Sequence, residues 1–280
     1  MTIRIVTDST CDLPPDVLAR YGITVVPLYI NIGDRGYLDG IDLSREEFYQ
    51  RLSDPARLPS TAAPGTEMFR RTYEELANEN ATEILSIHVS GTLSATLSHA
   101  RLGAAGVKEI PVTVFDSEQL SLGTGFLVMA AAKAVAEGRT MDEIKLSLAE
   151  QIPRTHLFAV LDSLEFLWRS GRVNELLAGL GSVLQIKPVF KVYCGCTAYD
   201  RVRTHKRAMN RLIHLLDEQL PLEEVAVVHT HTPSRAEQLR NQIRDLLPGT
   251  EIQSIDVSPV IAAHIGPDAV GLVCVATQKT

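Results

Sequence analysis

The chain has 280 residues, of which 45% are hydrophobic, 27 are basic and 34 are acidic, and its formal net charge is -7. This length and apolar content suffice for two hydrophobic cores, and the acidic balance argues against a nucleic-acid binder. No stretch is long and apolar enough to span a bilayer, and Arg4 and Asp8 interrupt the apolar residues that a secretory signal would need. Four cysteines do not make a disulfide framework. We therefore expect a cytoplasmic protein.

Short apolar runs alternate with helical patterns in the first half of the chain. The runs are typical of strands buried in a parallel sheet and lie at Arg4–Thr7, Ile23–Ile30, Ile84–Val89 and Val112–Phe115. Apolar residues at helical spacing predict a helix over Thr66–Asn80. Thr140 and Glu143 form a capping box that predicts a second helix, ending near Ile152. We therefore predict an N-terminal α/β domain with a parallel sheet, covering residues 1–154.

The second half, residues 155–280, has a different pattern. Two apolar runs, Val189–Tyr193 and Thr197–Arg201, flank a short turn that contains Gly195, which indicates an antiparallel hairpin. Helices are expected over Thr204–Gln219 and Ser234–Leu247. Further strands are expected at Val225–Val228, Ile252–Val257 and Val270–Ala276. The sequence therefore predicts a C-terminal α/β domain with a mixed sheet.

Hydroxyl side chains gather where the third predicted strand, Ile84–Val89, ends and a helix begins. They belong to Ser90, Thr92, Ser94 and Thr96. Unpaired N–H groups in the first turn of a helix carry partial positive charge, and hydroxyls beside them add donors for a carboxylate or phosphate. Helix capping explains the same residues without a ligand. We interpret the cluster as a candidate anion site in which Ser94 is the leading residue.

Two further segments carry side chains that suit the same site. The segment Pro59–Thr66 has two prolines, reads as an ordered loop and presents Thr61. The segment Pro259–Asp268 reads as a loop of small residues, which let the backbone approach a ligand, and it carries His264. We expect Thr61, Ser94 and His264 to face one cavity.

Two acidic–hydroxyl pairs, Asp8-Ser9 and Asp116-Ser117, each follow a predicted parallel strand. Open α/β sheets bind ligands at the carboxyl ends of their strands, which would bring both pairs near Ser94. Asp and Ser are also preferred at helix N-caps, so bracing of a loop or helix is the alternative to direct ligand contact.

Several motifs occur together in an order and spacing that is specific. They are Ile5-Val6-Thr7-Asp8-Ser9-Thr10-Cys11-Asp12-Leu13-Pro14, Leu58-Pro59-Ser60-Thr61, Leu93-Ser94-Ala95-Thr96, Phe115-Asp116-Ser117, Ser170-Gly171-Arg172-Val173, Ile186-Lys187-Pro188, Arg203-Thr204 and His264-Ile265-Gly266-Pro267. Through nearly its whole length the chain thus resembles the DegV family of bacterial fatty-acid-binding proteins. It departs from the usual family pattern at Ala62, Ala95, Ala262 and Asp268.

The resemblance implies a carrier without a cofactor rather than an enzyme. Such a carrier holds a long-chain fatty acid in an apolar tunnel and presents the carboxylate to a separate fatty-acid kinase, which makes the acyl phosphate for phospholipid synthesis. Thr61, Ser94 and His264 would bind the carboxylate. The possible supporting residues are Ser60, Ala95, Thr96, Asp116, Ser117 and Gly266.

Three arginines, Arg172, Arg201 and Arg203, lie in predicted loop or hairpin regions of the second domain. Arg203 matches a family arginine associated with productive engagement of the kinase. The fixed donor fork of arginine suits an acidic partner surface or a phosphate. Solvated surface charge is the alternative interpretation. We interpret the three as possible kinase-docking residues.

A hydrolase is the second functional hypothesis. Ser94, His264 and either Asp116 or Asp8 are the residue types of a nucleophilic triad, so the sequence also permits a serine-dependent lipid or ester hydrolase. Metal and nucleotide sites are not expected. The sequence has no phosphate-loop motif, and the closely spaced cysteines and histidines of the second half have no further ligands at a suitable spacing.

Overall fold

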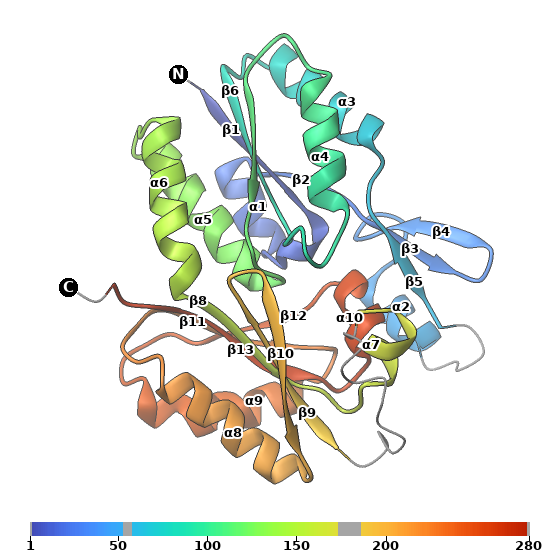
Figure 1. Ribbon diagram of the computed structural model, residues 1–280, viewed down its shortest axis with the longest axis vertical. Coiled ribbons are helices and arrows are strands. Elements are labelled where there is room, and N and C mark those ends of the chain that lie inside the picture. The colour runs from blue at the N-terminus through green and yellow to red at the C-terminus, as the bar shows by residue number, and fades with distance from the viewer. Residues whose placement is uncertain (1, 53–57, 173–185, 279–280) are drawn as a thin grey trace.

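The computed structural model describes residues 2–52, 58–172 and 186–278, and its strands form three sheets (Figure 1). A four-stranded parallel sheet has the order β2 (Thr24–Val26), β1 (Ile3–Asp8), β6 (Glu83–His88), β7 (Val112–Asp116). A six-stranded mixed sheet has the order β10 (Cys196–Val202), β9 (Lys187–Tyr193), β8 (Thr155–Val160), β13 (Val270–Ala276), β11 (Leu222–His229), β12 (Gln253–Asp256). A three-stranded antiparallel sheet has the order β4 (Arg35–Leu38), β3 (Tyr29–Ile32), β5 (Ser60–Ala62).

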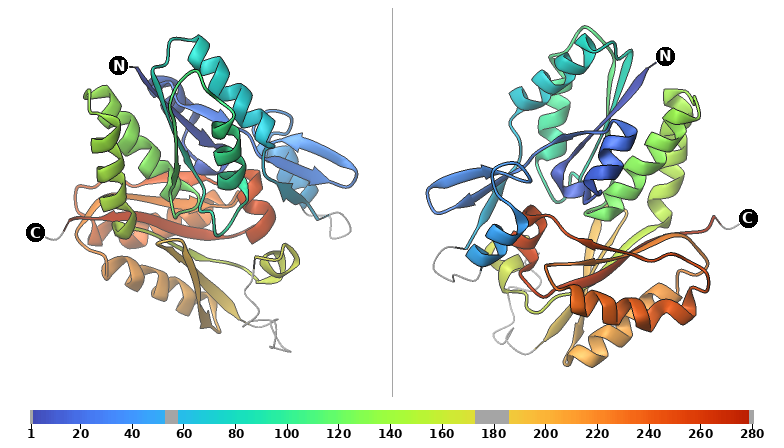
Figure 2. Two further views of the ribbon diagram at one scale, coloured as in Figure 1. Left: turned by 45° about the horizontal axis from the view of Figure 1, so that its top comes forward. Right: turned by 180° about the vertical axis from the view of Figure 1, so that it is seen from behind.

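Helices cover the faces of the two larger sheets (Figures 1 and 2). In the N-terminal half the helices are α1 (Pro15–Tyr21), α2 (Arg45–Leu52), α3 (Thr66–Asn78), α4 (Thr96–Ala105), α5 (Leu122–Ala136) and α6 (Met141–Gln151). In the C-terminal half they are α7 (Glu165–Arg169), α8 (His205–Asp217), α9 (Pro233–Ile243) and α10 (Pro259–Ile265). Short 3-10 helices are η1 (Ser9–Cys11), η2 (Ile152–Arg154) and η5 (Arg244–Leu246). Within the described ranges, no helix is both long and apolar enough to cross a membrane.

The predicted α/β organisation is confirmed, with a parallel sheet in the first half and a mixed sheet in the second. In β6 the side chains of Ile84, Leu85 and Ile87 are fully buried, as expected for a strand with a helix layer on each face. Helix α3 covers one face and buries Phe69 and Tyr73 completely, so the helical spacing identified its inward side.

One predicted strand is wrong, and the difference shapes the functional site. The run Ile23–Ile30 was expected to form a single parallel strand, but β2 ends at Val26 and β3 begins at Tyr29 in a different sheet. Pro27 falls at the break, where its lack of an N–H prevents it from donating to the ladder. Strand β3 pairs with β5, which occupies part of the segment Pro59–Thr66 that was expected to be a loop.

The C-terminal half follows the predicted elements except in one segment. Strands β9 and β10 form the expected hairpin, and Thr204 caps α8 through a side chain that accepts from Arg207 N–H. The segment Pro259–Asp268, expected to be a loop, instead forms α10. Proline suits the first position of a helix, and the helix ends at Gly266, whose φ of 78° places it in the left-handed region.

The two halves share a hydrophobic cluster. Helix α5 contacts β1 and β6 of the parallel sheet and also β8, β11 and β13 of the mixed sheet. Its fully buried Leu127 belongs to a cluster that includes Ile5 from the first half and Val273 from the second. Residue 154 ends η2 and residue 155 begins β8. The division into domains 1–154 and 155–280 stays a prediction.

Loss of the capping box on α6 should destabilise the protein measurably. Thr140 Oγ1 accepts from Glu143 N–H at 3.4 Å, while the Glu143 carboxylate accepts from Thr140 N–H at 2.8 Å. We expect Thr140→Ala to lower the free energy of unfolding by about 1 kcal/mol, measured by urea unfolding. Ser147→Ala is the matched control because it removes an exposed hydroxyl from the same helix without touching the cap. An equal effect of both variants would contradict the capping role.

Candidate functional site

A pocket lies where the parallel sheet, α10 and the β9–β10 hairpin meet. The space inside it is about 630 Å³, including the part open to solvent. Its wall is mainly aliphatic and aromatic and is formed by Leu28, Val89, Leu93, Leu120, Leu167, Phe190, Val260, Ile261 and Ile265. The polar residues at the pocket are Thr10, Thr61, Ser94, Arg172, Thr197 and His264. The three residues predicted to share a cavity do line one pocket.

Thr61 and His264 are in direct contact within this pocket. Thr61 lies in β5 opposite Ile30 of β3, and His264 lies near the end of α10. Thr61 Oγ1 and His264 Nε2 are 2.7 Å apart. When Nε2 carries the ring proton it donates to Thr61 Oγ1, and the threonine hydroxyl proton is then available to an anion.

The imidazole of His264 is held in its neutral form. Burial and, to a smaller extent, the positive charge of Arg172 together lower the pKa of His264 to about 4. Nδ1 is buried and has no hydrogen-bond partner among the described residues. Near pH 7 the ring is therefore a neutral donor and acceptor, and Arg172 is the positive charge beside it.

Ser94 lines the pocket and lies just before the start of a helix. It lies in the loop after β6, and its Oγ accepts from Thr96 N–H at 3.2 Å at the start of α4. Ser94 Oγ also lies 2.8 Å from the hydroxyl oxygen of Thr96, which is buried. Ala95, between them, is exposed. The capping interpretation and the pocket interpretation thus both describe Ser94, with Thr96 supporting its position.

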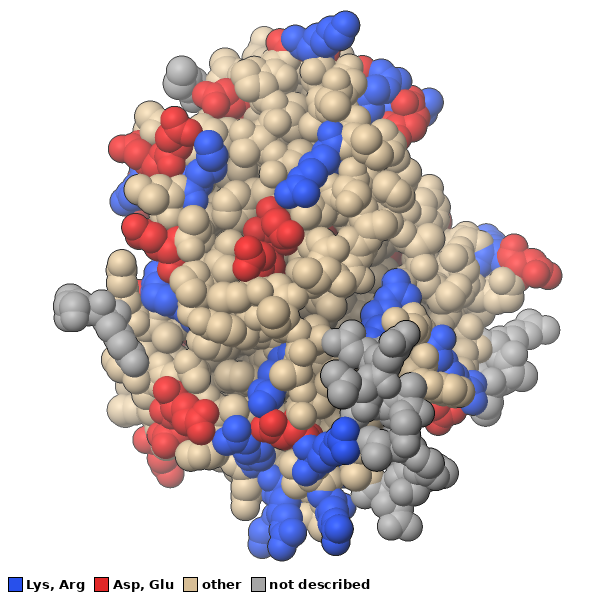
Figure 3. All heavy atoms as spheres, viewed as in Figure 1, with Lys and Arg blue, Asp and Glu red and all other residues tan. Residues whose placement is uncertain are grey.

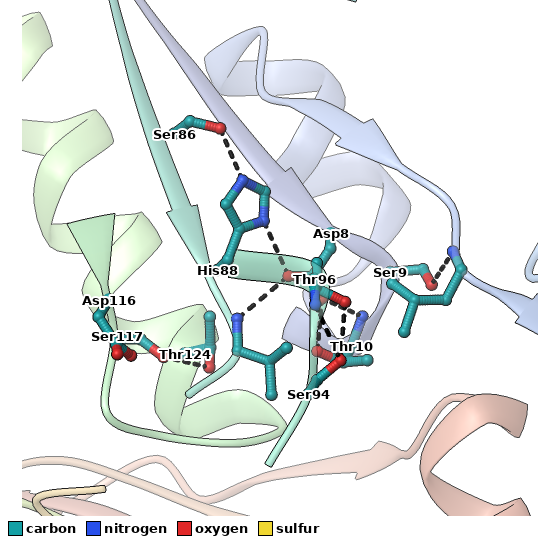
Figure 4. Close-up of polar contacts among 12 residues, drawn as sticks. Asp8, Ser9, Thr10, Ser86, His88, Ser94, Thr96, Asp116, Ser117 and Thr124 are labelled. Carbon is teal, nitrogen blue, oxygen red and sulfur yellow. Dashed lines mark hydrogen bonds and ion pairs between the residues drawn. The ribbon is translucent and has the colours of Figure 1, made fainter. Parts of the chain in front are cut away.

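A buried polar network holds the strand ends that form the pocket floor (Figure 4). Asp8 Oδ2 lies 2.9 Å from His88 Nδ1 and accepts from Val89 N–H at 3.1 Å. Asp8 Oδ1 accepts from the hydroxyl of Thr10 at 2.5 Å. Burial alone would raise the pKa of Asp8, but hydrogen bonding and the charge of His88 hold that pKa below its usual value. Because Thr10 and Val89 line the pocket, Asp8 fixes two of its wall residues.

Asp116 and Ser117 brace the loop and do not line the pocket as the structure describes it. The Asp116 carboxylate accepts from Gly91 N–H at 3.3 Å and from Glu118 N–H at 2.9 Å. Ser117 is buried, with its Oγ 3.0 Å from Thr124 Oγ1 (Figure 4). The contacts of Asp116 and Ser117 therefore match loop bracing, the alternative to direct ligand contact.

The three arginines are divided between two places. Arg172 lines the pocket beside His264, whereas Arg201 in β10 and Arg203 just after it are exposed. Lys and Arg side chains gather around that end of the β9–β10 hairpin and the adjoining part of α8 (Figure 3). Val173, which completes the motif containing Arg172, lies outside the described residues.

The remaining supporting candidates lie next to His264 or Thr61. Ser60 is exposed and lines a groove together with Thr61 and His264. Gly266 ends α10 with a positive φ, and a Cβ atom there would lie 2.5 Å from the ring of Phe166. A side chain at this position would therefore displace either the Phe166 ring or the end of the helix that carries His264.

The predicted nucleophilic triad is not assembled. His264 contacts Thr61, and among the described residues neither Asp8 nor Asp116 is bonded to it. A series of serine, histidine and aspartate does occur elsewhere, with Ser86 Oγ 2.7 Å from His88 Nε2 and Asp8 on the other ring nitrogen. All three of these side chains are fully buried, so a substrate has no access to Ser86.

Comparison with known proteins gives consistent matches over the full chain. A family model described as "Uncharacterised protein, DegV family" matches residues 2–277. A DegV domain-containing protein of Streptomyces coelicolor is 34% identical over 276 residues, covering 97% of each chain. Protein DegV of Bacillus subtilis is 30% identical over 281 residues, covering 97% of this chain and 98% of that protein.

Solved structures with the same fold cover nearly the whole chain. The structure described as fatty acid binding of a DegV family protein from Thermus thermophilus is 32% identical, with a TM-score of 0.90 and coverage of 99% of this chain and 100% of that one. The structure of DegV, a fatty acid binding protein from Bacillus subtilis, is 30% identical, with the same TM-score and coverage.

The depressed pKa of His264 should be visible in solution. Because the unfolded side chain titrates near 6.5 and the folded one near 4, the unfolded state binds more protons between these values. The free energy of unfolding should therefore fall as pH drops from about 6.5 to about 4, and His264→Gln should remove this contribution. NMR titration of the ring in wild type and Arg172→Ala checks the cause, since loss of the arginine charge should raise the pKa. Titration of wild-type His264 near 6.5 would contradict the assignment.

Proposed function

The chain belongs to the DegV family, and from that premise we propose that it binds a long-chain fatty acid. The acyl chain would lie along the apolar wall of the pocket, and the carboxylate would lie at Thr61, Ser94 and His264. The contact between Thr61 and His264 at the wall of a mainly apolar pocket is the observation that carries this proposal. The Thermus and Bacillus structures are described as those of fatty-acid-binding proteins, which supports the same class of ligand.

The acyl chain supplies most of the binding free energy in this proposal. Transfer of each methylene from water to an apolar wall contributes about 0.8 kcal/mol before ordering costs. The carboxylate contributes selectivity, because a desolvated charge without hydrogen bonds is costly. The hydroxyls of Thr61 and Ser94 offer donors, and Arg172 offers a positive charge that a neutral His264 does not supply.

A kinase partner completes the proposed role. The carrier would present the carboxylate to a separate fatty-acid kinase, which would phosphorylate it to the acyl phosphate. Arg201 and Arg203 would contact that partner, and their exposure beside Lys206 and Arg207 supports a basic docking surface. The position of Arg172 in the pocket suits the carboxylate better than the docking surface. The hydrolase alternative lacks support, because His264 contacts Thr61 rather than a carboxylate.

Removal of either hydroxyl should weaken fatty-acid binding. We expect Thr61→Ala and Ser94→Ala each to cost about 1 to 3 kcal/mol of binding free energy, the usual loss when a charged group loses a donor. Displacement of a fluorescent fatty acid measures the affinity. Ser234→Ala, which removes an exposed hydroxyl from α9, is the matched control. Unchanged affinity in the Thr61→Ala, Ser94→Ala double variant would remove both residues from the proposed site.

The docking role of Arg203 separates kinase engagement from lipid binding. In a mixture with a fatty-acid kinase, Arg203→Ala should lower acyl-phosphate formation several-fold and leave fatty-acid affinity nearly unchanged, because the side chain is exposed and does not line the pocket. Arg139→Ala is the control, an exposed arginine of the other half of the chain. Equal turnover by wild type and Arg203→Ala would reject the docking role while leaving the lipid proposal standing.

A further inference from the structure

A second cavity borders the fatty-acid pocket and has a separate set of lining residues. Both cavities use η1 and α10 as walls: Thr10 and His264 line the first, whereas Ser9, Cys11 and Pro259 line the second. The space in the second cavity is about 1250 Å³, including the part open to solvent. Its remaining walls come from α1, β2, the segment between β4 and α2, and the start of α2.

Two buried carboxylates line this cavity. Asp12 is 3% exposed and Asp39 is 5% exposed. Asp12 is well bonded, because Oδ1 accepts from Ser258 N–H at 2.7 Å and Oδ2 accepts from the hydroxyl of Ser121 at 2.5 Å. Asp39 Oδ2 has no hydrogen-bond partner in the described part of the chain. The hydroxyl of Ser258, which is 3% exposed, interacts with the Asp12 carboxylate, and its oxygen accepts no hydrogen bond from a described residue. Two buried acceptors at one cavity wall are thus unsatisfied.

The charges around Asp39 leave a negative excess. Burial raises the pKa of Asp39 to about 7, and the charges of Asp12 and Asp8 raise it too, whereas Ser9 and Arg45 lower it. Arg45 is the cation that lines the cavity, and its guanidinium also donates to the backbone carbonyl of Asp256. Among the described residues, and with Asp39 ionised above about pH 7, two carboxylates against one guanidinium leave one negative charge at the wall. A buried carboxylate without a compensating partner is costly, so a bound cation would relieve it.

The cavity is suited to an organic cation rather than a metal ion. Aliphatic side chains line it, namely Leu13, Leu18, Val25, Ile41 and Leu43. Among the described residues, no group of three or more His, Cys, Asp or Glu side chains could hold a metal ion. An ammonium group has three N–H donors, which suit Asp39 Oδ2 and Ser258 Oγ, and an attached alkyl group would cover aliphatic surface.

We propose that this second cavity binds a small organic ammonium ion, with its N–H groups donating to Asp39 and Ser258 and its alkyl body against the aliphatic wall. The ligand class follows from a monovalent charge excess, unsatisfied acceptors and an apolar face in one cavity. The proposed ammonium site is separate from the proposed site of the fatty-acid carboxylate, because neither Asp39 nor Ser258 lines the fatty-acid pocket.

Titration with butylammonium chloride tests the proposal on the full-length protein. Binding is followed by NMR or calorimetry at about pH 8, above the pKa of Asp39, with 1-butanol as a neutral probe of the same chain length and sodium chloride matched for ionic strength. We expect saturable binding of one butylammonium per chain and at least a tenfold loss of affinity in Asp39→Asn. Asp34→Asn, which changes an exposed carboxylate in the β3–β4 turn, should bind like wild type.

Three results would overturn the proposal: equal affinity in wild type and Asp39→Asn, binding of 1-butanol as tight as that of butylammonium, or a crystal structure of the soaked protein with ordered water only in the cavity. Ser258→Ala provides a second variant if Asp39→Asn does not fold, and it should weaken butylammonium several-fold. Each variant is also assayed for fatty-acid affinity. That affinity should be unchanged, so failure here is distinguishable from failure of the fatty-acid proposal.

Discussion

The carboxylate of Asp8 joins the ends of β1 and β6, and the pocket depends on this junction. It accepts from Val89 N–H at the end of one strand, from Thr10 at the end of the other, and it contacts His88 between them. All of these groups are buried, so removal of one partner would leave the carboxylate without one of its hydrogen bonds in the interior, at a cost of about 1 to 3 kcal/mol. The network therefore fixes the floor from which the Ser94 loop and η1 extend.

On that floor, chain segments far apart in the sequence converge at one small polar area. The pairing of β3 with β5 brings Thr61 to the pocket, α10 brings His264, and the loop after β6 brings Ser94. Burial keeps the imidazole neutral, so it can orient the threonine hydroxyl without adding charge of its own. The remaining wall is largely apolar. This combination suits an amphiphile with one anionic group and a long hydrocarbon chain.

The sequence was most informative where the pattern is local. The largely apolar run of β6 and the helical spacing of Phe69 and Tyr73 reflect burial of those elements themselves, and both predictions are confirmed. Local patterns could not show that the chain changes sheets at Pro27, between β2 and β3, or that Arg172 lies in the pocket. Both features depend on tertiary contacts. Helix α10 did have a signal: Pro259 opens it and Gly266 ends it, but its small residues were read as a loop. The hydrogen-bonded link from His88 to Asp8 spans 80 positions and was missed.

The fatty-acid assignment is tested most directly by the lipid that the protein carries when purified. Denaturing extraction followed by mass spectrometry identifies and counts any bound molecule, and uptake of a labelled fatty acid tests protein that has been stripped of lipid. We predict one long-chain fatty acid per chain, and restored occupancy after stripping. A protein that purifies without lipid and also fails to take up labelled fatty acid would contradict the proposed function.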